Sequence, residues 1–233
     1  MKRTFGILAA WLMVTVMVIT GCAKATSSPI ALTAAEIFNK SGERLQAINS
    51  FHFGLDQVGG GTPIAMGIEM IKAEGDVVRP DKLQTTISGT TMGMALEVKL
   101  VTSSEKTYMT NPLSGKWELL PEQFRILSLF DPGAGIAAIM KDIAVPTKLT
   151  DEGVGGTICY HLKGSVVSDS LRPIIGSAAT AVVISAEVWI GKEDFLVRHI
   201  KLEGKITESE KEGIIRTLDL SNFDQEVSIK LPE

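Results

Sequence analysis

The sequence predicts an α+β protein in which a large antiparallel β-sheet curls beneath a helical cover. Three observations lead to this class. A helical pattern stands near the N-terminus, most of the chain beyond it alternates apolar and polar residues with period two, and a short apolar helical insert interrupts the strands near the middle. Because a sheet of this many strands must curl, close or be covered, the insert is the natural cover for a concave face.

The first helix is expected over about residues 34–48. Thr33-Ala34-Ala35-Glu36 is a capping box with Thr33 as the N-cap. A strand is then expected over 51–58, followed by a glycine-rich turn at 59–63. The following strands are predicted to place on one apolar face each Ile64, Met66, Ile68 and Met70; Leu83, Thr85 and Ile87; and Met92, Met94, Leu96, Val98 and Leu100.

The helical insert is expected after Pro121, a residue suited to a first turn. It carries Phe124, Leu127 and Phe130 on one side, breaks at Asp131-Pro132-Gly133, and resumes as a short apolar helix over about 134–143 with Ile136, Ile139 and Met140. Strands are expected again to the end of the chain, at about 158–166, 182–190, 196–203, 213–220 and 223–231, with a helical crossover at 168–177.

Composition excludes several classes of function. The chain has 233 residues and a net charge of -4, which suits one medium-sized domain and gives no electrostatic footprint for nucleic acid. Two cysteines cannot form a disulfide framework, and three scattered histidines, His52, His161 and His199, favour hydrogen-bonded strand residues over a metal site. The sequence has none of the common catalytic motifs and no nucleophile–base pair, so we expect neither an enzyme nor a cofactor.

The N-terminus has the pattern of a secretory signal. Lys2-Arg3 precedes an apolar run from Phe5 to Ile19, and Thr20-Gly21 precedes Cys22. This arrangement resembles the bacterial lipobox, in which the cysteine becomes the first residue and carries a diacylglycerol; the alternative is a plain signal peptide with an incidental cysteine. We therefore expect a signal peptide over 1–21, a lipid-modified Cys22 with a tether over 22–32, and an extracytoplasmic domain over 33–233 held on the membrane. Cys159 is expected to be buried or half-buried in a strand, without a chemical role.

The methionines are concentrated on the apolar strand faces. Met66, Met70, Met92 and Met94 lie on neighbouring predicted strands, and Met140 lies in the cover. Flexible, polarizable methionine suits an irregular apolar surface that accommodates variable partners, but it also fills gaps in an ordinary core. Composition leaves both readings open.

The sequence also resembles the LppX/LprA/LprF/LprG lipoproteins of mycobacteria and their relatives in other bacteria. The matching pieces, in order, are SFHF at 50–53, YMTNPLSGKW at 108–117, Asp131-Pro132, GTICYHLKG at 156–164, VWIG at 188–191, FLVR at 195–198 and LSNFD at 220–224. The resemblance implies a strongly curved antiparallel half-barrel with helices over its concave side, as in the carriers LolA and LolB. It further implies an apolar cavity for lipids or glycolipids that are moved across the envelope.

These inferences define the expected site and partners. The ligand would be a lipid or glycolipid whose acyl chains contact Ile64, Met66, Ile68, Met70, Met92, Met94, Leu96 and Val98 beneath a cover of Phe124, Leu127, Phe130, Ile136, Ile139 and Met140. The other partner would be the membrane, through the lipid on Cys22. The alternative function is a sensor or assembly module that binds an envelope protein on the same fold.

Overall fold

A computed structural model gives the structure of the protein and describes residues 31–64, 67–104, 106–121, 130–131, 135–172 and 178–232. The chain divides into two units, Met1–Ala31 and Leu32–Glu233, and every element described below belongs to the second. Within the described ranges, no helix combines the length and the apolar character needed to cross a membrane.

Helix α1 (Ala34–Gln46) begins where the capping box predicts. The Thr33 side chain accepts from the Glu36 backbone N–H, and the Glu36 carboxylate accepts from the Thr33 backbone N–H. The hydrogen bonds from Thr33 hold the pKa of Glu36 below its ordinary value. One face of the helix is buried, and it carries Ala34, Ile37, Phe38, Ser41, Gly42 and Leu45. The predicted helix is thus confirmed to within two residues at its C-terminal end.

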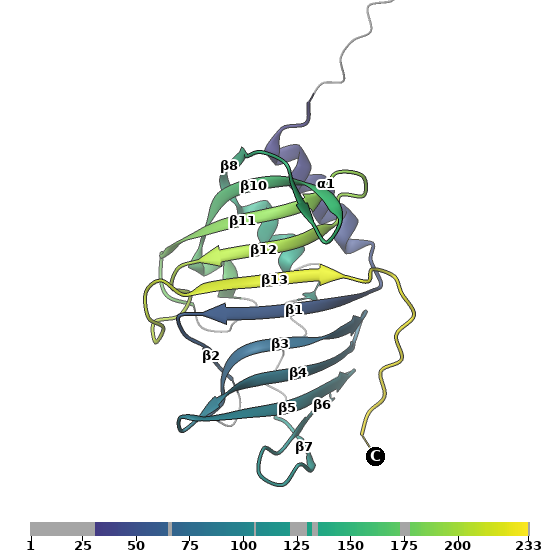
Figure 1. Ribbon diagram of the computed structural model, residues 1–233, viewed down its shortest axis with the longest axis vertical. Coiled ribbons are helices and arrows are strands. Elements are labelled where there is room, and N and C mark those ends of the chain that lie inside the picture. The colour runs from purple at the N-terminus through teal and green to yellow at the C-terminus, as the bar shows by residue number, and fades with distance from the viewer. Residues whose placement is uncertain are drawn as a thin grey trace, which may run out of the picture. The chain divides into compact units, whose positions relative to one another are not determined.

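A large sheet dominates the unit (Figure 1), and the described residues contribute 13 strands to it. The strands are β1 (Ser50–Val58), β2 (Thr62–Pro63), β3 (Glu69–Val78), β4 (Lys82–Thr91), β5 (Met94–Ser103), β6 (Lys106–Thr110), β7 (Trp117–Leu119), β8 (Ala144–Lys148), β9 (Glu152–Val154), β10 (Thr157–Val167), β11 (Val183–Gly191), β12 (Val197–Glu203) and β13 (Ile215–Ser221). Their order is β7-β6-β5-β4-β3-β1-β13-β12-β11-β10-β8, with β2 paired to β3 and β9 to β10. Each pairing is antiparallel, which confirms the predicted sheet type, whereas the half-barrel curvature stays a prediction.

Among the described residues, the helical segments between the strands are short. They are α2 (Ile136–Ile139), η3 (Met140–Asp142) and η4 (Ser168–Leu171). Helix α1 lies at the end of the sheet that holds β8, β10 and β11 (Figure 1) and contacts α2, η3 and β8. A Cβ at Gly42 of α1 would lie 3.4 Å from the Ala137 carbonyl oxygen, so a small residue allows the close approach of α1 and α2.

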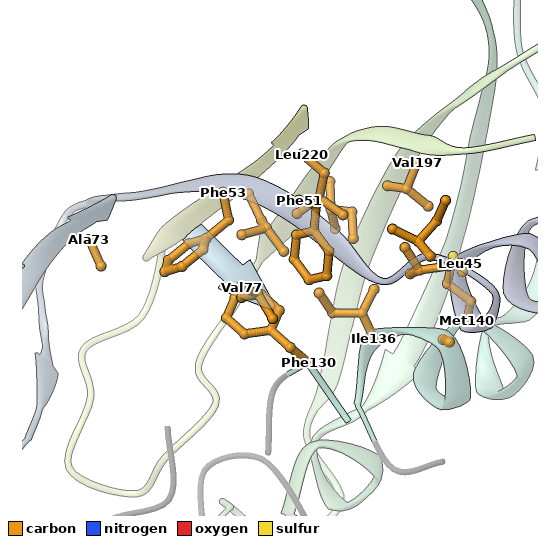
Figure 2. Close-up of a cluster of buried hydrophobic side chains, with 14 of the residues drawn as sticks. Leu45, Phe51, Phe53, Ala73, Val77, Phe130, Ile136, Met140, Val197 and Leu220 are labelled. Carbon is orange, nitrogen blue, oxygen red and sulfur yellow. The ribbon is translucent and has the colours of Figure 1, made fainter. Parts of the chain in front are cut away.

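The main core joins one face of the sheet to α1, α2 and Phe130. The Phe130 ring lies 5.3 Å from the Phe51 ring and 4.7 Å from the Phe53 ring, measured between centroids. Figure 2 shows these three rings gathered together, with Ile136 and Met140 beside them. A smaller cluster of Val166, Leu171, Ile184 and Ile206 lies apart from this core, and Ile139 packs against it.

Three sequence expectations are wrong in detail. Met92 was expected in a strand, but with Gly93 it forms the β4–β5 turn, where both residues have positive φ and Met92 is 96% exposed. The strand expected at 223–231 is absent from the described chain: the Asp224 N–H donates to the Ser50 carbonyl oxygen at the start of β1, but no regular pairing with a strand follows. The strand expected over 64–70 does not form as one element, since regular pairing of β3 starts only at Glu69.

Candidate functional site

The register of the sheet aligns apolar residues across eight strands. From β10 to β5, the directly paired residues are Leu162, Val188, Ile200, Leu218, Leu55, Ala73, Ile87 and Val98. Seven of these are buried and Leu55 is partly buried against the same core. We call the face that carries this row the inner face. It is an uninterrupted apolar surface, which the alternation within single strands could not reveal.

The next row of paired residues points to the opposite side, because side chains alternate along a strand. It consists of His161, Trp189, His199, Asp219, Gly54, Glu74, Thr86 and Lys99. We call this side the outer face. The sheet therefore separates an apolar face from a polar one, as expected of an antiparallel sheet with one covered side.

The structure brings most of the described candidate residues to the inner face or its cover. Ile68, Met70 and Val98 are buried with Phe130, Ile136 and Met140 in the main core, while Ile64 and Leu96 are partly buried against it. Ile139 instead joins the smaller cluster. Met94 shares the side of Leu96 and Val98 along β5 but is 61% exposed, and Met92 lies in the turn. Met66, Phe124, Leu127 and Cys22 lie outside the described residues.

Arg79 ties the cover to the sheet, and no motif in the sequence marks it. Its Nη1 donates to the carbonyl oxygens of Leu45 and Ile48, 2.6 and 2.8 Å away, at the end of α1. Its Nη2 donates to the Phe130 carbonyl oxygen at 3.1 Å. Burial lowers the pKa of Arg79, and the charges of Asp131 and Asp224 partly offset this. One side chain thus holds the helix end and the segment that delivers Phe130, a link that no local pattern predicts.

The inner face also has polar groups near one end of β1. Gln57 pairs in register with Arg216, and both are buried. Arg216 forms an ion pair with Glu210 and donates to the Gly204 carbonyl oxygen. Glu210 also accepts from the backbone N–H groups of Ile206 and Thr207. A buried pair with these additional hydrogen bonds organises the loop between β12 and β13.

The three histidines lie on the outer face and each meets a carboxylate, which confirms that they are hydrogen-bonded strand residues. His52 Nδ1 lies 2.8 Å from Asp76, His161 Nε2 lies 2.9 Å from Glu187, and His199 Nδ1 lies 2.6 Å from Asp219. The rings of His161 and Trp189 stack with centroids 4.2 Å apart. Over the described ranges, no group of three or more His, Cys, Asp and Glu side chains could hold a metal.

Cys159 fits the role expected from the sequence. Its side chain is buried, and burial raises the pKa of the thiol above its ordinary value. A buried thiol with a raised pKa carries little of the reactive thiolate at neutral pH.

Fold and site together define an antiparallel-sheet protein whose distinctive surface is an apolar face beneath a helical cover. The sequence matches the LppX_LprAFG lipoprotein family over residues 33–229. The chain belongs to this family, whose members are non-enzymatic lipid-binding proteins. No curated protein shows a significant sequence match.

Solved structures that share the fold include two mycobacterial lipoproteins. LprF from Mycobacterium bovis matches with a TM-score of 0.68 and 14% identity, covering 85% of this chain and 96% of that one. LppX from Mycobacterium tuberculosis matches with a TM-score of 0.62 and 14% identity, covering 84% of this chain and 98% of that one. A LolA superfamily protein from Nitrosomonas europaea is 14% identical and covers 87% of this chain and 96% of its own, but its TM-score of 0.30 is too low to carry an assignment.

Proposed function

We propose that the protein is a membrane-anchored extracytoplasmic lipoprotein that binds the acyl chains of a lipid or glycolipid and carries or chaperones them in the cell envelope. The observation that carries this proposal is the lipoprotein-family match over residues 33–229. The partly buried apolar side chains at the margin of the inner face, Ile64 and Leu96, support it, because an acyl chain needs an apolar surface rather than a few polar groups. Burial of each methylene would contribute roughly 0.8 kcal/mol.

The ligand-contacting surface would lie beside the closed core rather than within it. The Phe130 ring packs against the rings of Phe51 and Phe53. These rings already contact one another, so they are not free to contact a ligand. Ile64 and Leu96 are only partly buried at the margin of the same cluster, and Met94 continues the line of Leu96 outward along β5. We propose that these three side chains, with Met66, Phe124 and Leu127, contact the chains.

The anchor is the second part of the proposal. A diacylglycerol on Cys22 supplies two acyl chains, which give stable membrane attachment where one chain gives only marginal binding. The tether over 22–32 would then separate the domain from the bilayer, after removal of residues 1–21. Mass spectrometry and membrane fractionation of the bacterially expressed full chain test this: we expect a lipid-modified Cys22 at the N-terminus, and a Cys22→Ser variant that leaves the membrane fraction.

Lipid binding is tested on residues 23–233 purified without detergent, by organic extraction and mass spectrometry. We expect stoichiometric lipid on the wild type. Leu96→Asp should retain about tenfold less, because a carboxylate at an apolar binding surface is costly to desolvate. Met94→Asp, at a more exposed position, should reduce retention without a loss of folding.

Val58→Asp is the matched control. Val58 is 67% exposed and alternates with Gln57, so its side chain belongs to the outer face at the end of β1. This variant should keep its lipid. A folded wild type that carries no lipid and refuses added lipid would overturn the proposal and direct attention to an envelope protein partner. Equal lipid on Leu96→Asp and wild type would exclude the inner face as the site.

A further inference from the structure

A polar groove lies on the outer face, on the side of the sheet opposite the apolar row. It has a volume of about 730 Å³, within the range of about 300–1,000 Å³ typical of ligand sites. Most of its side chains come from three neighbouring strands in register, and His52 of β1 and Trp117 of β7 line it as well. Across β3, β4 and β5 the rows are Asp76, Gln84 and Val101; Glu74, Thr86 and Lys99; and Lys72, Ser88 and Glu97.

Side-chain length explains the hollow. The middle strand, β4, contributes the short side chains of Thr86 and Ser88, whereas β3 and β5 contribute long charged side chains on either side. Trp117, the first residue of β7, lines the groove from the edge of the sheet. The groove thus has a floor of hydroxyl groups, charged walls and an indole at one side.

The polar groups are held in place by their own hydrogen bonds. Asp76 accepts from His52 Nδ1 at 2.8 Å through one carboxylate oxygen and from Gln84 Nε2 at 2.9 Å through the other. His52 Nε2 lies 3.6 Å from Glu74, and Lys72 Nζ lies 3.8 Å from the other Glu74 oxygen. Because the Gln84 amide nitrogen donates to Asp76, the Gln84 amide oxygen remains as an acceptor for a ligand. Thr86 and Ser88 add hydroxyl groups that both donate and accept hydrogen bonds.

We propose that this groove binds a neutral carbohydrate. Two lysines face three carboxylates within it, so the groove has no excess of positive charge with which to hold a phosphate or another polyanion. Its interleaved donors and acceptors match sugar hydroxyls, each of which donates and accepts. Trp117 supplies the electron-rich ring face on which the C–H side of a sugar packs. The groove site is independent of the acyl-chain site on the inner face.

Binding is measured on the compact unit, residues 32–233, with maltotriose and mannotriose as neutral probes and trigalacturonate as the anionic probe. Titration calorimetry and tryptophan fluorescence should detect the neutral sugars, and trigalacturonate should bind at least about tenfold more weakly. Trp117→Ala should weaken neutral binding about tenfold, because it removes the aromatic face on which the sugar packs.

Leu119→Ala is the matched control, because Leu119 is exposed on the same strand, β7, but does not line the groove. It should leave sugar affinity unchanged within about twofold. Leu96→Asp should also leave it unchanged, so failure of acyl-chain binding and failure of sugar binding are separate results. No binding of either neutral sugar at about 10 mM, equal binding of trigalacturonate, or binding unaffected by Trp117→Ala would each overturn the proposal.

The two sources of such a sugar are a free glycan and a lipid headgroup, and flotation with phosphatidylcholine vesicles separates them. Vesicles that contain digalactosyl diacylglycerol should capture the unit, in a manner competed by the trisaccharides, when the natural ligand is a headgroup. If the unit binds the trisaccharides in solution but floats with neither plain phosphatidylcholine vesicles nor those that contain digalactosyl diacylglycerol, the natural ligand is a free glycan. Capture that Trp117→Ala leaves intact would contradict a role for the groove.

Discussion

Two buried serines differ in what their hydroxyls contact. Ser41, on the buried face of α1, has an Oγ with no hydrogen-bond partner among the described residues, whereas Ser50 Oγ donates to the Gln225 carbonyl oxygen at 2.6 Å. A buried hydroxyl without a partner keeps its desolvation cost, while a paired one contributes about 1 kcal/mol net. The same residue type therefore has opposite effects on stability at these two positions.

Serine-to-alanine changes at these positions should shift stability in opposite directions. Ser41→Ala should raise the free energy of unfolding by about 0.5–1 kcal/mol, because it removes the unpaired hydroxyl and improves helix propensity. Ser50→Ala should lower it by about 1 kcal/mol. Urea unfolding of both variants measures the difference, and a destabilising Ser41→Ala would show that its hydroxyl has a partner that this structure does not assign.

The Glu187 carboxyl on the outer face makes the stability of the fold depend on pH. Burial is the largest single influence and raises the pKa of this carboxyl, but the hydrogen bond from His161 and the charges of Lys201 and Lys163 together outweigh it. The pKa of Glu187 therefore lies below its ordinary value of 4.5. Its contribution to stability is fully present above pH 4.5 and is lost as the pH falls through the folded-state pKa.

Replacement of the Glu187 carboxyl should make the free energy of unfolding depend less steeply on pH at acidic pH. Glu187→Gln should be less stable than wild type at neutral pH, and the two curves should converge as the pH falls below 4.5. Denaturant unfolding at a series of pH values measures this convergence. Glu43→Gln, at an exposed position on α1, serves as control and should run parallel to wild type. A constant offset between Glu187→Gln and wild type down to the lowest pH would refute the assignment.

At the scale of elements, two strand glycines lie in contrasting surroundings. A Cβ on Gly75 of β3 would lie 2.0 Å from the Gln84 carbonyl oxygen of β4, whereas a Cβ on Gly54 of β1 would meet nothing within 4 Å. Gly75 also pairs with Phe53, one of the rings that pack on Phe130. The close contact of β3 with β4 therefore depends on the missing side chain at position 75.

Alanine substitutions at the two glycines should distinguish the effect of close strand packing on stability from the effect of replacing a strand glycine in general. Gly75→Ala should lower the free energy of unfolding by about 1–3 kcal/mol, because β3 and β4 must move apart. Gly54→Ala should change it by about 0.5 kcal/mol or less. Thermal and urea unfolding provide the measurement, and similar values for the two variants would contradict the strand spacing described here.

Short sequence patterns predict an element well where side chains bond to backbone groups a few residues away, and less well elsewhere. The capping box fixes the start of α1 because Thr33 and Glu36 satisfy each other's backbone groups within one turn. In the sequence the alternation that marks β5 already starts at Met92, so period two conceals the turn at Met92-Gly93, which depends on two positive φ angles. The apolar alternation near Val227 likewise predicts a strand, yet no neighbouring strand pairs with that segment.

At the scale of the whole molecule, the sequence predicts which residues share a strand face but not which strands are neighbours. The apolar row exists because β1 lies between β3 and β13, an arrangement set by tertiary register. For the same reason the candidate acyl-chain residues could be named from the sequence, whereas Arg79 and the outer groove could not. Arg79 acts on carbonyl oxygens at Leu45, Ile48 and Phe130, which are distant from it in sequence.

Loss of the Arg79 contacts should weaken the whole unit. Arg79→Met keeps much of the side-chain length but removes three hydrogen bonds to buried carbonyl oxygens, so we expect the free energy of unfolding to fall by about 2–4 kcal/mol. Arg172→Met is the control, because that arginine is exposed and forms a surface ion pair with Asp169, which contributes about 1 kcal/mol or less. Urea unfolding compares the two, and equal losses would show that Arg79 does not join the cover to the sheet.

The place of β13 between β1 and β12 bears on how the chain reaches its folded state. Strands β3 to β7 follow β1 and pair in sequence order, so this half can form from local hairpins. One edge of β1 then offers unpaired N–H and C=O groups until β13, the last described strand, is made. The pairing of β1 with β13 joins residues far apart in the chain, so it is expected to form slowly. Until it forms, the unpaired edge of β1 can pair with strands of other molecules. A chain that crosses a membrane before folding would therefore be most prone to aggregation in the interval before β13 adds to β1.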